Sequence, residues 1–274
     1  ESAWYNHRNY YYNCIRDVDQ HIGCVLNALQ QSGQAEHTMV VFTSDHGEMA
    51  GAHGMRQKGP SMYKENIGVS LYIDHPDFPA SETDALATSV DLIPTLLEIS
   101  GVPDIETAAR WPDLKGVSLA GALNGGKTAR DDKGMLIDYT ATLSWDVDLI
   151  GTIFAGQARG SFTSVDKARM AEGMSMDNYA CFRGINDGQY KFARYFKPSE
   201  HHMPRDWQTL SAHNELELYD TFEDPDECCN LANSSLPESK QLILDLNSKL
   251  NELIDSEIGT DDGSCYPPGR NYTL

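Results

Sequence analysis

The sequence changes character at Thr38-Met-Val-Val-Phe-Thr-Ser-Asp-His-Gly47, where an apolar run gives way to polar side chains. The first half, Thr38–Phe42, is β-branched and apolar and is bounded by turn residues, a pattern typical of a strand buried on both faces. In open α/β sheets, ligands gather at the carboxyl ends of the strands. Asp45 and His46 directly follow this strand, so they are candidate ligand-binding residues.

The segments on either side complete an α/β pattern. Apolar residues recur at spacings of three and four from Tyr11 to Leu29, which predicts an amphipathic helix with Gly33 as its C-cap. A second strand is predicted at Val69–Ile73, and a helix at Asp91–Ser100 with Pro94 in its first turn. Helix, strand, strand and helix in this order predict a mostly parallel sheet covered by helices, with Thr38–Phe42 parallel to its neighbours.

The pattern changes near residue 176. Tyr179–Gly184 and Gln189–Phe196 flank Asn186-Asp-Gly188, which predicts an antiparallel hairpin, and Glu215–Asp220 is a candidate third strand. The run Ser235-Leu-Pro-Glu238 resembles a capping box and predicts the start of a last helix.

Two domains follow from these patterns. Residues 1–175 form the α/β part, and residues 176–274 form a small α+β subdomain with an antiparallel sheet. Between Pro103 and Ser175 the periodicity is weak, and a strand at Met135–Asp138 is the one element that the sequence predicts there.

Charge and composition exclude several partners. The 274 residues contain 21 Lys and Arg against 41 Asp and Glu, a net charge of −20 that repels nucleic acid and anionic membrane surfaces. No apolar run approaches the ~18 residues of a membrane span, so we expect no membrane insertion. The six cysteines include no C-x-x-C pair, which argues against a structural zinc site.

Asp45 and His46 have the chemistry of metal ligands. A carboxylate beside a neutral imidazole can bind a divalent cation, and the carboxylate favours calcium, magnesium or manganese. Two ligands are too few for such an ion, so the others must come from elsewhere. The alternative is that both residues merely cap a turn, because Asp, His and Gly are common where strands end.

The run Phe42-Thr-Ser-Asp-His-Gly-Glu-Met-Ala-Gly-Ala-His-Gly-Met-Arg-Gln-Lys-Gly-Pro60 is similar to a signature of the sulfatase family, within the alkaline phosphatase superfamily. The resemblance continues at Val90–Leu97, Arg183–Lys191 and Glu217–Glu227. It implies that residues 1–175 are a partial sulfatase-like α/β catalytic domain lacking its N-terminal strands, followed by the family's carboxy-terminal subdomain.

The resemblance also implies roles for individual residues. Asp45 and His46 match one half of the family's metal site, which would hold a divalent cation, calcium first and magnesium or manganese as alternatives. Lys58 matches the lysine that binds the sulfuryl group and neutralises charge as the ester bond breaks. His53 lies in the same loop, where it could protonate a leaving alkoxide or cap the loop, and both interpretations stay open.

The other half of the family's site has no counterpart in these 274 residues. The family pattern includes paired aspartates after an N-terminal strand and a C-x-P-S-R or S-x-P-S-R sequence whose first residue becomes formylglycine, and neither occurs here. We therefore expect a carboxy-terminal portion of a sulfuric ester hydrolase that acts on a sulfate ester of a small molecule or glycan. This portion alone is expected to be inactive, and the resemblance suggests a periplasmic or extracellular location.

Two other functions agree with the same residues. A phosphonate monoester or phosphodiester hydrolase of the same superfamily also uses Asp-His-Gly and a following lysine. A noncatalytic module could keep the fold without the chemistry. The absent nucleophile favours the module, whereas Asp45, His46 and Lys58 favour an enzyme.

Overall fold

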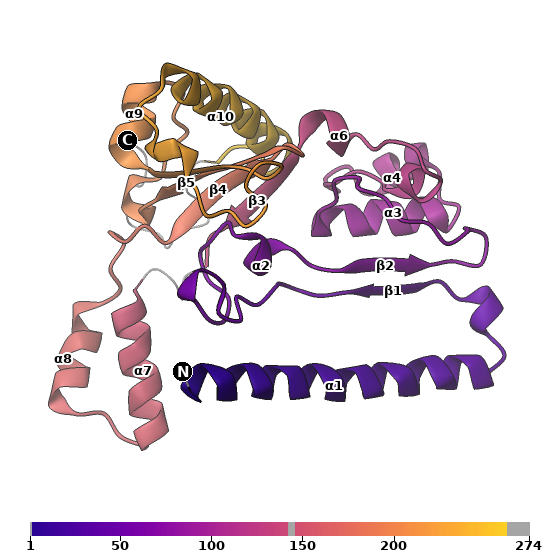
Figure 1. Ribbon diagram of the computed structural model, residues 1–274, viewed down its shortest axis with the longest axis horizontal. Coiled ribbons are helices and arrows are strands. Elements are labelled where there is room, and N and C mark those ends of the chain that lie inside the picture. The colour runs from indigo at the N-terminus through magenta and orange to yellow at the C-terminus, as the bar shows by residue number, and fades with distance from the viewer. Residues whose placement is uncertain (1, 142–145, 262–274) are drawn as a thin grey trace. The chain divides into compact units, whose positions relative to one another are not determined.

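A computed structural model describes residues 2–141 and 146–261 of the chain (Figure 1). The chain divides into two compact units, Glu1–Thr83 and Asp84–Leu274, which are described separately below. The domain boundary at residue 176 that the sequence suggests stays a proposal about the two parts of the family's fold.

The first unit begins with a long helix, α1 (Ser2–Gln31), which includes the predicted helix and extends it at both ends. The chain reverses after α1, where Gly33 has a φ of +71°. The remaining elements are short: η1 (Ala35–His37), β1 (Val40–Thr43), η2 (Ala52–Gly54), α2 (Lys64–Ile67) and β2 (Leu71–Asp74).

The two predicted strands of this unit pair with each other. The register runs from Val40 opposite Asp74 to Thr43 opposite Leu71, and the pairing is antiparallel. The prediction that the Thr38–Phe42 strand lies parallel to its neighbour is therefore wrong for this pair. A parallel pair needs a crossover, usually a helix of several turns, whereas the segment between β1 and β2 contains only the single-turn η2 and α2, so the chain doubles back.

The second unit contains a four-stranded antiparallel sheet in the order β3-β4-β5-β6. Its strands are β3 (Met135–Tyr139), β4 (Cys181–Asn186), β5 (Tyr190–Phe196) and β6 (Glu215–Asp220). The predicted hairpin is confirmed as β4 and β5, with Gly188 in the turn at a φ of +101°. The predicted third strand is confirmed as β6.

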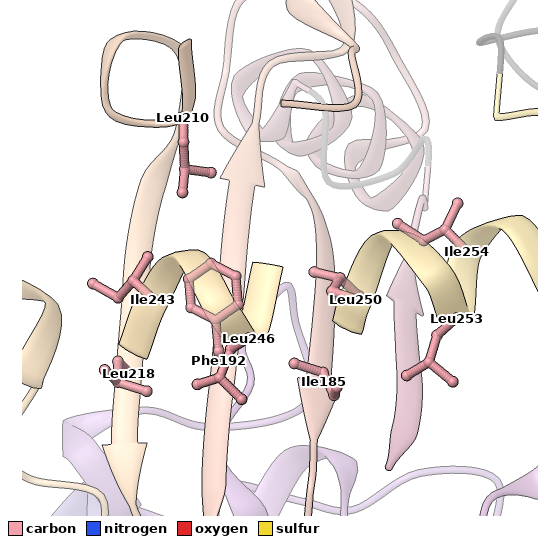
Figure 2. Close-up of a cluster of buried hydrophobic side chains, with 9 residues drawn as sticks. All are labelled: Ile185, Phe192, Leu210, Leu218, Ile243, Leu246, Leu250, Leu253 and Ile254. Carbon is pink, nitrogen blue, oxygen red and sulfur yellow. The ribbon is translucent and has the colours of Figure 1, made fainter. Parts of the chain in front are cut away.

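One face of this sheet is covered by α10 (Pro237–Glu257). Figure 2 shows the helix lying across the strands, with Leu246 beside Phe192 and Leu250 beside Ile185. The buried cluster between them consists of Ile185, Phe192, Leu210, Leu218, Ile243, Leu246, Leu250, Leu253 and Ile254. Burial of these apolar side chains is the main stabilising contribution in the unit.

The capping box predicted at Ser235–Glu238 does not form. The N-cap of α10 is Leu236, which makes no side-chain cap hydrogen bond, and Pro237 occupies the first helical position. Proline favours that position because its φ is already helical and its missing N–H leaves no unsatisfied donor. Pro237 therefore places the N-cap at Leu236, one residue beyond the serine.

The stretch that the sequence left unassigned folds mainly into short helices. The predicted Asp91–Ser100 helix is confirmed as α3 (Leu92–Ile99), preceded by η3 (Ser89–Asp91). The further helices of this unit are α4 (Asp104–Arg110), α5 (Ala120–Leu123), α6 (Arg130–Lys133), α7 (Val147–Arg159), α8 (Ser164–Glu172), η5 (Pro198–Glu200), α9 (Trp207–His213) and η6 (Leu231–Asn233). Among the described residues, no helix combines the length and the apolar character needed to cross a bilayer.

Candidate functional site

Asp45 and His46 lie just past the end of β1 and face a common point. The carboxylate oxygen Oδ2 of Asp45 is 3.4 Å from Nε2 of His46. The other carboxylate oxygen accepts a hydrogen bond from the backbone N–H of His46 at 2.9 Å, which fixes the direction of the Asp45 side chain. The Asp45 side chain is 81% exposed and that of His46 is 37% exposed, so both are open to a ligand.

Lys58 returns to this pair from the far side of the loop. Its Nζ lies 2.5 Å from Nε2 of His46. An ammonium group can only donate, so Nε2 accepts, and the ring proton is then on Nδ1, which donates to the carbonyl oxygen of Gly47 at 2.8 Å. With these donor and acceptor roles, the Nε2 lone pair points toward the Lys58 ammonium, and this tautomer is one that can bind a metal through Nε2.

The three side chains form one electrostatic unit. The two distances above place the Lys58 ammonium within about 6 Å of the Asp45 carboxylate, close enough for a charge to shift a pKa. The hydrogen bond from the backbone N–H of His46 lowers the pKa of Asp45 most, and the charge of Lys58 adds a smaller effect in the same direction. Both keep the carboxylate in the ionised form that a metal needs.

Backbone constraints set the path of the loop between His46 and Lys58. The N–H of Gly47 donates to the carbonyl oxygen of Asn66 at 2.9 Å. A Cβ atom at Gly47 would lie 2.0 Å from the carbonyl oxygen of Glu65, so only glycine allows this approach. Three non-glycine residues of the loop, Ala50, His53 and Gln57, have positive φ values of 46°, 52° and 64°.

The first two turns of α1 pack against the same loop. The guanidinium group of Arg56 lies 5.5 Å from the ring centroid of Trp4, a cation–π distance. Nε2 of His7 is 3.8 Å from Oε1 of Glu48. The helix thus supports the loop from one side, and Arg56 is engaged with Trp4.

His53 is packed inside the loop. Its ring stacks on Tyr63 with centroids 3.7 Å apart and an interplanar angle of 13°, and its Nε2 is 3.9 Å from Oε2 of Glu65. The side chain is only 16% exposed. These contacts favour the loop-capping interpretation of His53, and a role as acid toward a leaving group stays a prediction.

The geometry of the Asp45–His46 pair fits a shared cation. Two donor atoms 3.4 Å apart match neighbouring ligands around an ion with bonds of about 2.4 Å, the range of calcium–oxygen bonds. Within residues 2–141 and 146–261, no group of three or more His, Cys, Asp or Glu side chains could hold a metal ion. The residues present therefore fit part of a coordination sphere.

Two further residues organise the loop: Glu48, for which the sequence suggested a place behind the metal pair or at the start of a helix, and Asn66, which sequence reasoning missed. Oε1 of Glu48 accepts backbone N–H groups from Ala50 and Gln57. Asn66 is 6% exposed and bonds to the backbone at Gly59 and Ser61. Asn66 follows Lys64 and Glu65, so the sequence carried no signal that its side chain is buried, and nothing in the sequence indicated that Glu48 binds a main-chain group nine residues away.

Comparison with known proteins shows which family the chain resembles. The sulfatase family model matches residues 1–102, which contain the Asp45, His46 and Lys58 loop. An arylsulfatase K of Xenopus laevis is 28% identical over 249 residues, which cover 90% of this chain and 37% of that protein. These matches place residues 1–102 in the sulfatase family, and the similarity to an arylsulfatase extends over most of the chain.

Solved structures agree with that assignment. The structure of BT4656 in complex with its substrate D-glucosamine-2-N,6-O-disulfate superposes with a TM-score of 0.61 at 25% identity, covering 92% of this chain and 41% of that one. The phosphonate monoester hydrolase of Agrobacterium radiobacter gives a TM-score of 0.61 at 24% identity, covering 89% of this chain and 40% of that one. The likeness confirms the predicted α/β class with its antiparallel carboxy-terminal part. The chain spans about two fifths of the length of these proteins.

Proposed function

We propose that this chain supplies half of the metal site and the sulfate-binding lysine of a sulfuric ester hydrolase. The observation that carries the proposal is the contact of Lys58 with His46 at 2.5 Å, beside Asp45. The match of residues 1–102 to the sulfatase family, with an arylsulfatase among the relatives, supports a sulfate ester of a small molecule or glycan as the substrate.

Each residue has a separate task in this proposal. Asp45 and His46 would hold a divalent cation, calcium first, with carboxylate oxygen and the Nε2 lone pair. When bound, the cation would act as a Lewis acid toward a nonbridging oxygen of the sulfate group. Lys58 would donate to the sulfate and neutralise charge that develops as the ester bond breaks. The family's formylglycine nucleophile would come from outside these 274 residues.

The division of tasks is testable in the parent enzyme that contains this segment. Asp45→Ala should abolish metal binding and turnover of nitrophenyl sulfate together. Lys58→Ala should leave metal bound and lower kcat by about 100-fold, the cost of removing one group that stabilises charge in the transition state. The exposed Lys127, which lies in the other unit, offers a matched control as Lys127→Ala. Equal loss of metal in the Asp45 and Lys58 variants would contradict the division.

The isolated chain should lack activity. Without a nucleophile, a cation and a lysine leave the covalent step undone. Metal-dependent turnover of nitrophenyl sulfate by the purified 274-residue chain would refute the proposed division of the site between this segment and the rest of the enzyme.

A phosphonate monoester or phosphodiester hydrolase is the second candidate. The specific observation in its favour is the fold shared with the phosphonate monoester hydrolase of Agrobacterium radiobacter. The ratio of kcat/KM for nitrophenyl sulfate to that for the corresponding phosphonate, measured on the parent enzyme, separates the two activities. Absence of both activities in a parent with an intact nucleophile would favour a noncatalytic module.

A further inference from the structure

The backbone on both sides of Lys58 is fixed by side chains that the proposed chemistry does not use. On one side, the N–H of Gln57 donates to Oε1 of Glu48 at 2.6 Å. The same oxygen accepts the N–H of Ala50 at 3.1 Å. Glu48 thus joins the two ends of the loop segment that leads from the metal pair to Lys58.

On the other side, the amide of Asn66 holds the residue that follows Lys58. Its Oδ1 accepts the N–H of Gly59 at 3.2 Å, and its Nδ2 donates to the carbonyl oxygens of Gly59 and Ser61 at 2.7 and 2.8 Å. The backbone oxygen of Asn66 also accepts the N–H of Gly47. Asn66 therefore forms hydrogen bonds with the backbone of Gly47 and Gly59, the residues that follow His46 and Lys58.

A fixed backbone limits where the ammonium group of a lysine can lie. A lysine side chain has high rotamer entropy, so fixing the backbone beneath it reduces the range of positions that its ammonium can reach. Gln57 adopts a left-handed φ of +64°, a conformation that a non-glycine residue keeps only when its surroundings enforce it. The hydrogen bond to Glu48 is charge-assisted and therefore among the stronger bonds available for this purpose.

We infer that Glu48 and Asn66 are positioning residues that hold the Lys58 ammonium beside Asp45 and His46. The inference rests on the proposed function for its catalytic meaning, but its structural content concerns this chain alone. His7 approaches the same Glu48 oxygen at 3.8 Å, too far for a hydrogen bond, so the two backbone amides define the role of Glu48.

Three variants of Glu48 separate the reach of the side chain from its charge. Glu48→Gln keeps the length and an accepting oxygen without the charge. Glu48→Asp keeps the charge but is one methylene shorter and cannot span to Gln57. Glu48→Ala lacks both. Glu106→Ala, an exposed glutamate of the other unit, is the matched control for removing a carboxylate.

Two measurements on the 274-residue chain at fixed pH report the contact without requiring activity. Amide hydrogen exchange at Gln57 should rise about 10-fold or more in the Asp and Ala variants, as expected for loss of a hydrogen bond to a charged group. The ¹⁵N chemical shift of His46 Nε2 should move at least half of the way to the value in Lys58→Ala. Glu48→Gln should keep both values nearer to the wild type than to Glu48→Ala, because its neutral amide oxygen still reaches and accepts, although more weakly. Glu106→Ala should leave both values close to the wild type.

The outcomes distinguish this inference from the proposed function. Unchanged exchange and an unchanged His46 shift in both the Asp and Ala variants would overturn the positioning role. A Gln variant that behaves like the Ala variant would also overturn it, because charge rather than reach would then matter. In the parent enzyme, Glu48→Asp should lower kcat more than it raises KM, with metal content retained. A parent that hydrolyses no sulfate ester would contradict the proposed function and leave the exchange and shift results to decide the positioning.

Discussion

The two units of the chain place apolar residues in opposite environments. In the second unit, nine apolar residues between α10 and the sheet are 4% exposed or less. In the first unit, α1 contains no buried residue, and Phe42 and Tyr72 on the paired strands are 43% and 66% exposed. Within the described part of the first unit, the buried side chains are Met49, Met62 and Asn66, all in the segment between β1 and β2.

Stability and candidate chemistry therefore lie in different parts of the chain. The second unit has a continuous hydrophobic core, whereas the packing of the first unit is concentrated in the loop that carries Asp45, His46 and Lys58. Functional residues commonly lie on loops that are held by rigid neighbours. Here the loop is stabilised by nearby buried side chains and by the left-handed conformations of Ala50, His53 and Gln57. Its order therefore depends on local contacts more than on a hydrophobic core.

Shortening a core side chain of the second unit should change the free energy of unfolding more than any other substitution proposed. Leu250→Ala removes a fully buried leucine and should lower the free energy of unfolding by about 2 to 5 kcal/mol. Val18→Ala on α1, where the side chain is 55% exposed, should cost about 0.5 kcal/mol or less. Urea denaturation of both variants measures the contrast. A similar cost for the two would mean that Val18 is covered in solution and that the comparison between the units fails.

The next prediction tests the local order of the loop. Gly47→Ala places a Cβ 2.0 Å from a backbone oxygen and should cost about 1 to 3 kcal/mol of local stability, the usual range for overpacking. Gly59→Ala is the matched control, because a Cβ there meets nothing within 4 Å and the φ is not positive. Hydrogen exchange of the loop amides should rise in the first variant and stay unchanged in the second. Equal exchange in both would show that the loop relaxes freely.

The third prediction concerns a buried carboxylate of the second unit. Burial alone would raise the pKa of Asp261, but the hydrogen bond with His201 and the charge of Arg183 outweigh it and lower the pKa to about 2. Nε2 of His201 lies 2.9 Å from Oδ1, and the Arg183 guanidinium lies 3.3 Å away. Because the folded pKa is below the ordinary value, the stabilisation is present above about pH 4 and is lost as the pH falls toward 2.

Asp261→Asn should remove this pH dependence. The variant should lower the free energy of unfolding by about 1 to 2 kcal/mol at pH 7 and by less at pH 2.5. The exposed Asp255 gives the control, Asp255→Asn, which should show neither effect. Denaturation curves at the two pH values measure both. An Asp261 variant with an undiminished pH dependence would assign that dependence to other groups. Asp45, by contrast, is exposed, so solvent screens its charge interactions and its lowered pKa should contribute little to the pH dependence of unfolding.

The sequence predicted what is encoded locally. The β4–β5 hairpin was predicted from the turn residues Asn186-Asp-Gly188 between two strand-like runs, and β6 was predicted with its full extent. The direction of β1 was wrong because strand pairing depends on a partner and on the connection to it. The helices between residues 104 and 172 were missed because most are too short for a clear period.

In the candidate site, too, some contacts could be predicted from the sequence and others could not. The motif predicted that Asp45, His46 and Lys58 approach one another, and the structure brings them together. It could not predict Glu48 or Asn66 as supports, because their hydrogen bonds go to main-chain groups whose positions depend on the left-handed path of the loop. Side-chain identities are visible in a sequence, whereas the backbone path that joins them is not.

The smallest expected change in stability concerns the start of α10. There the N-cap is Leu236, which makes no side-chain cap hydrogen bond, and the predicted capping box is absent. Leu236 has the extended backbone of an N-cap, with φ −70° and ψ 135°, and is 60% exposed. Leu236→Ser should therefore add a side-chain acceptor for the first free N–H groups and raise the free energy of unfolding of the second unit by about 1 kcal/mol. Ser235→Ala should change little, because Ser235 precedes the N-cap. Thermal and urea denaturation of both variants measure the effect. If Ser235→Ala is the more destabilised variant and Leu236→Ser gains nothing, the helix in solution begins at the capping box and not at Pro237.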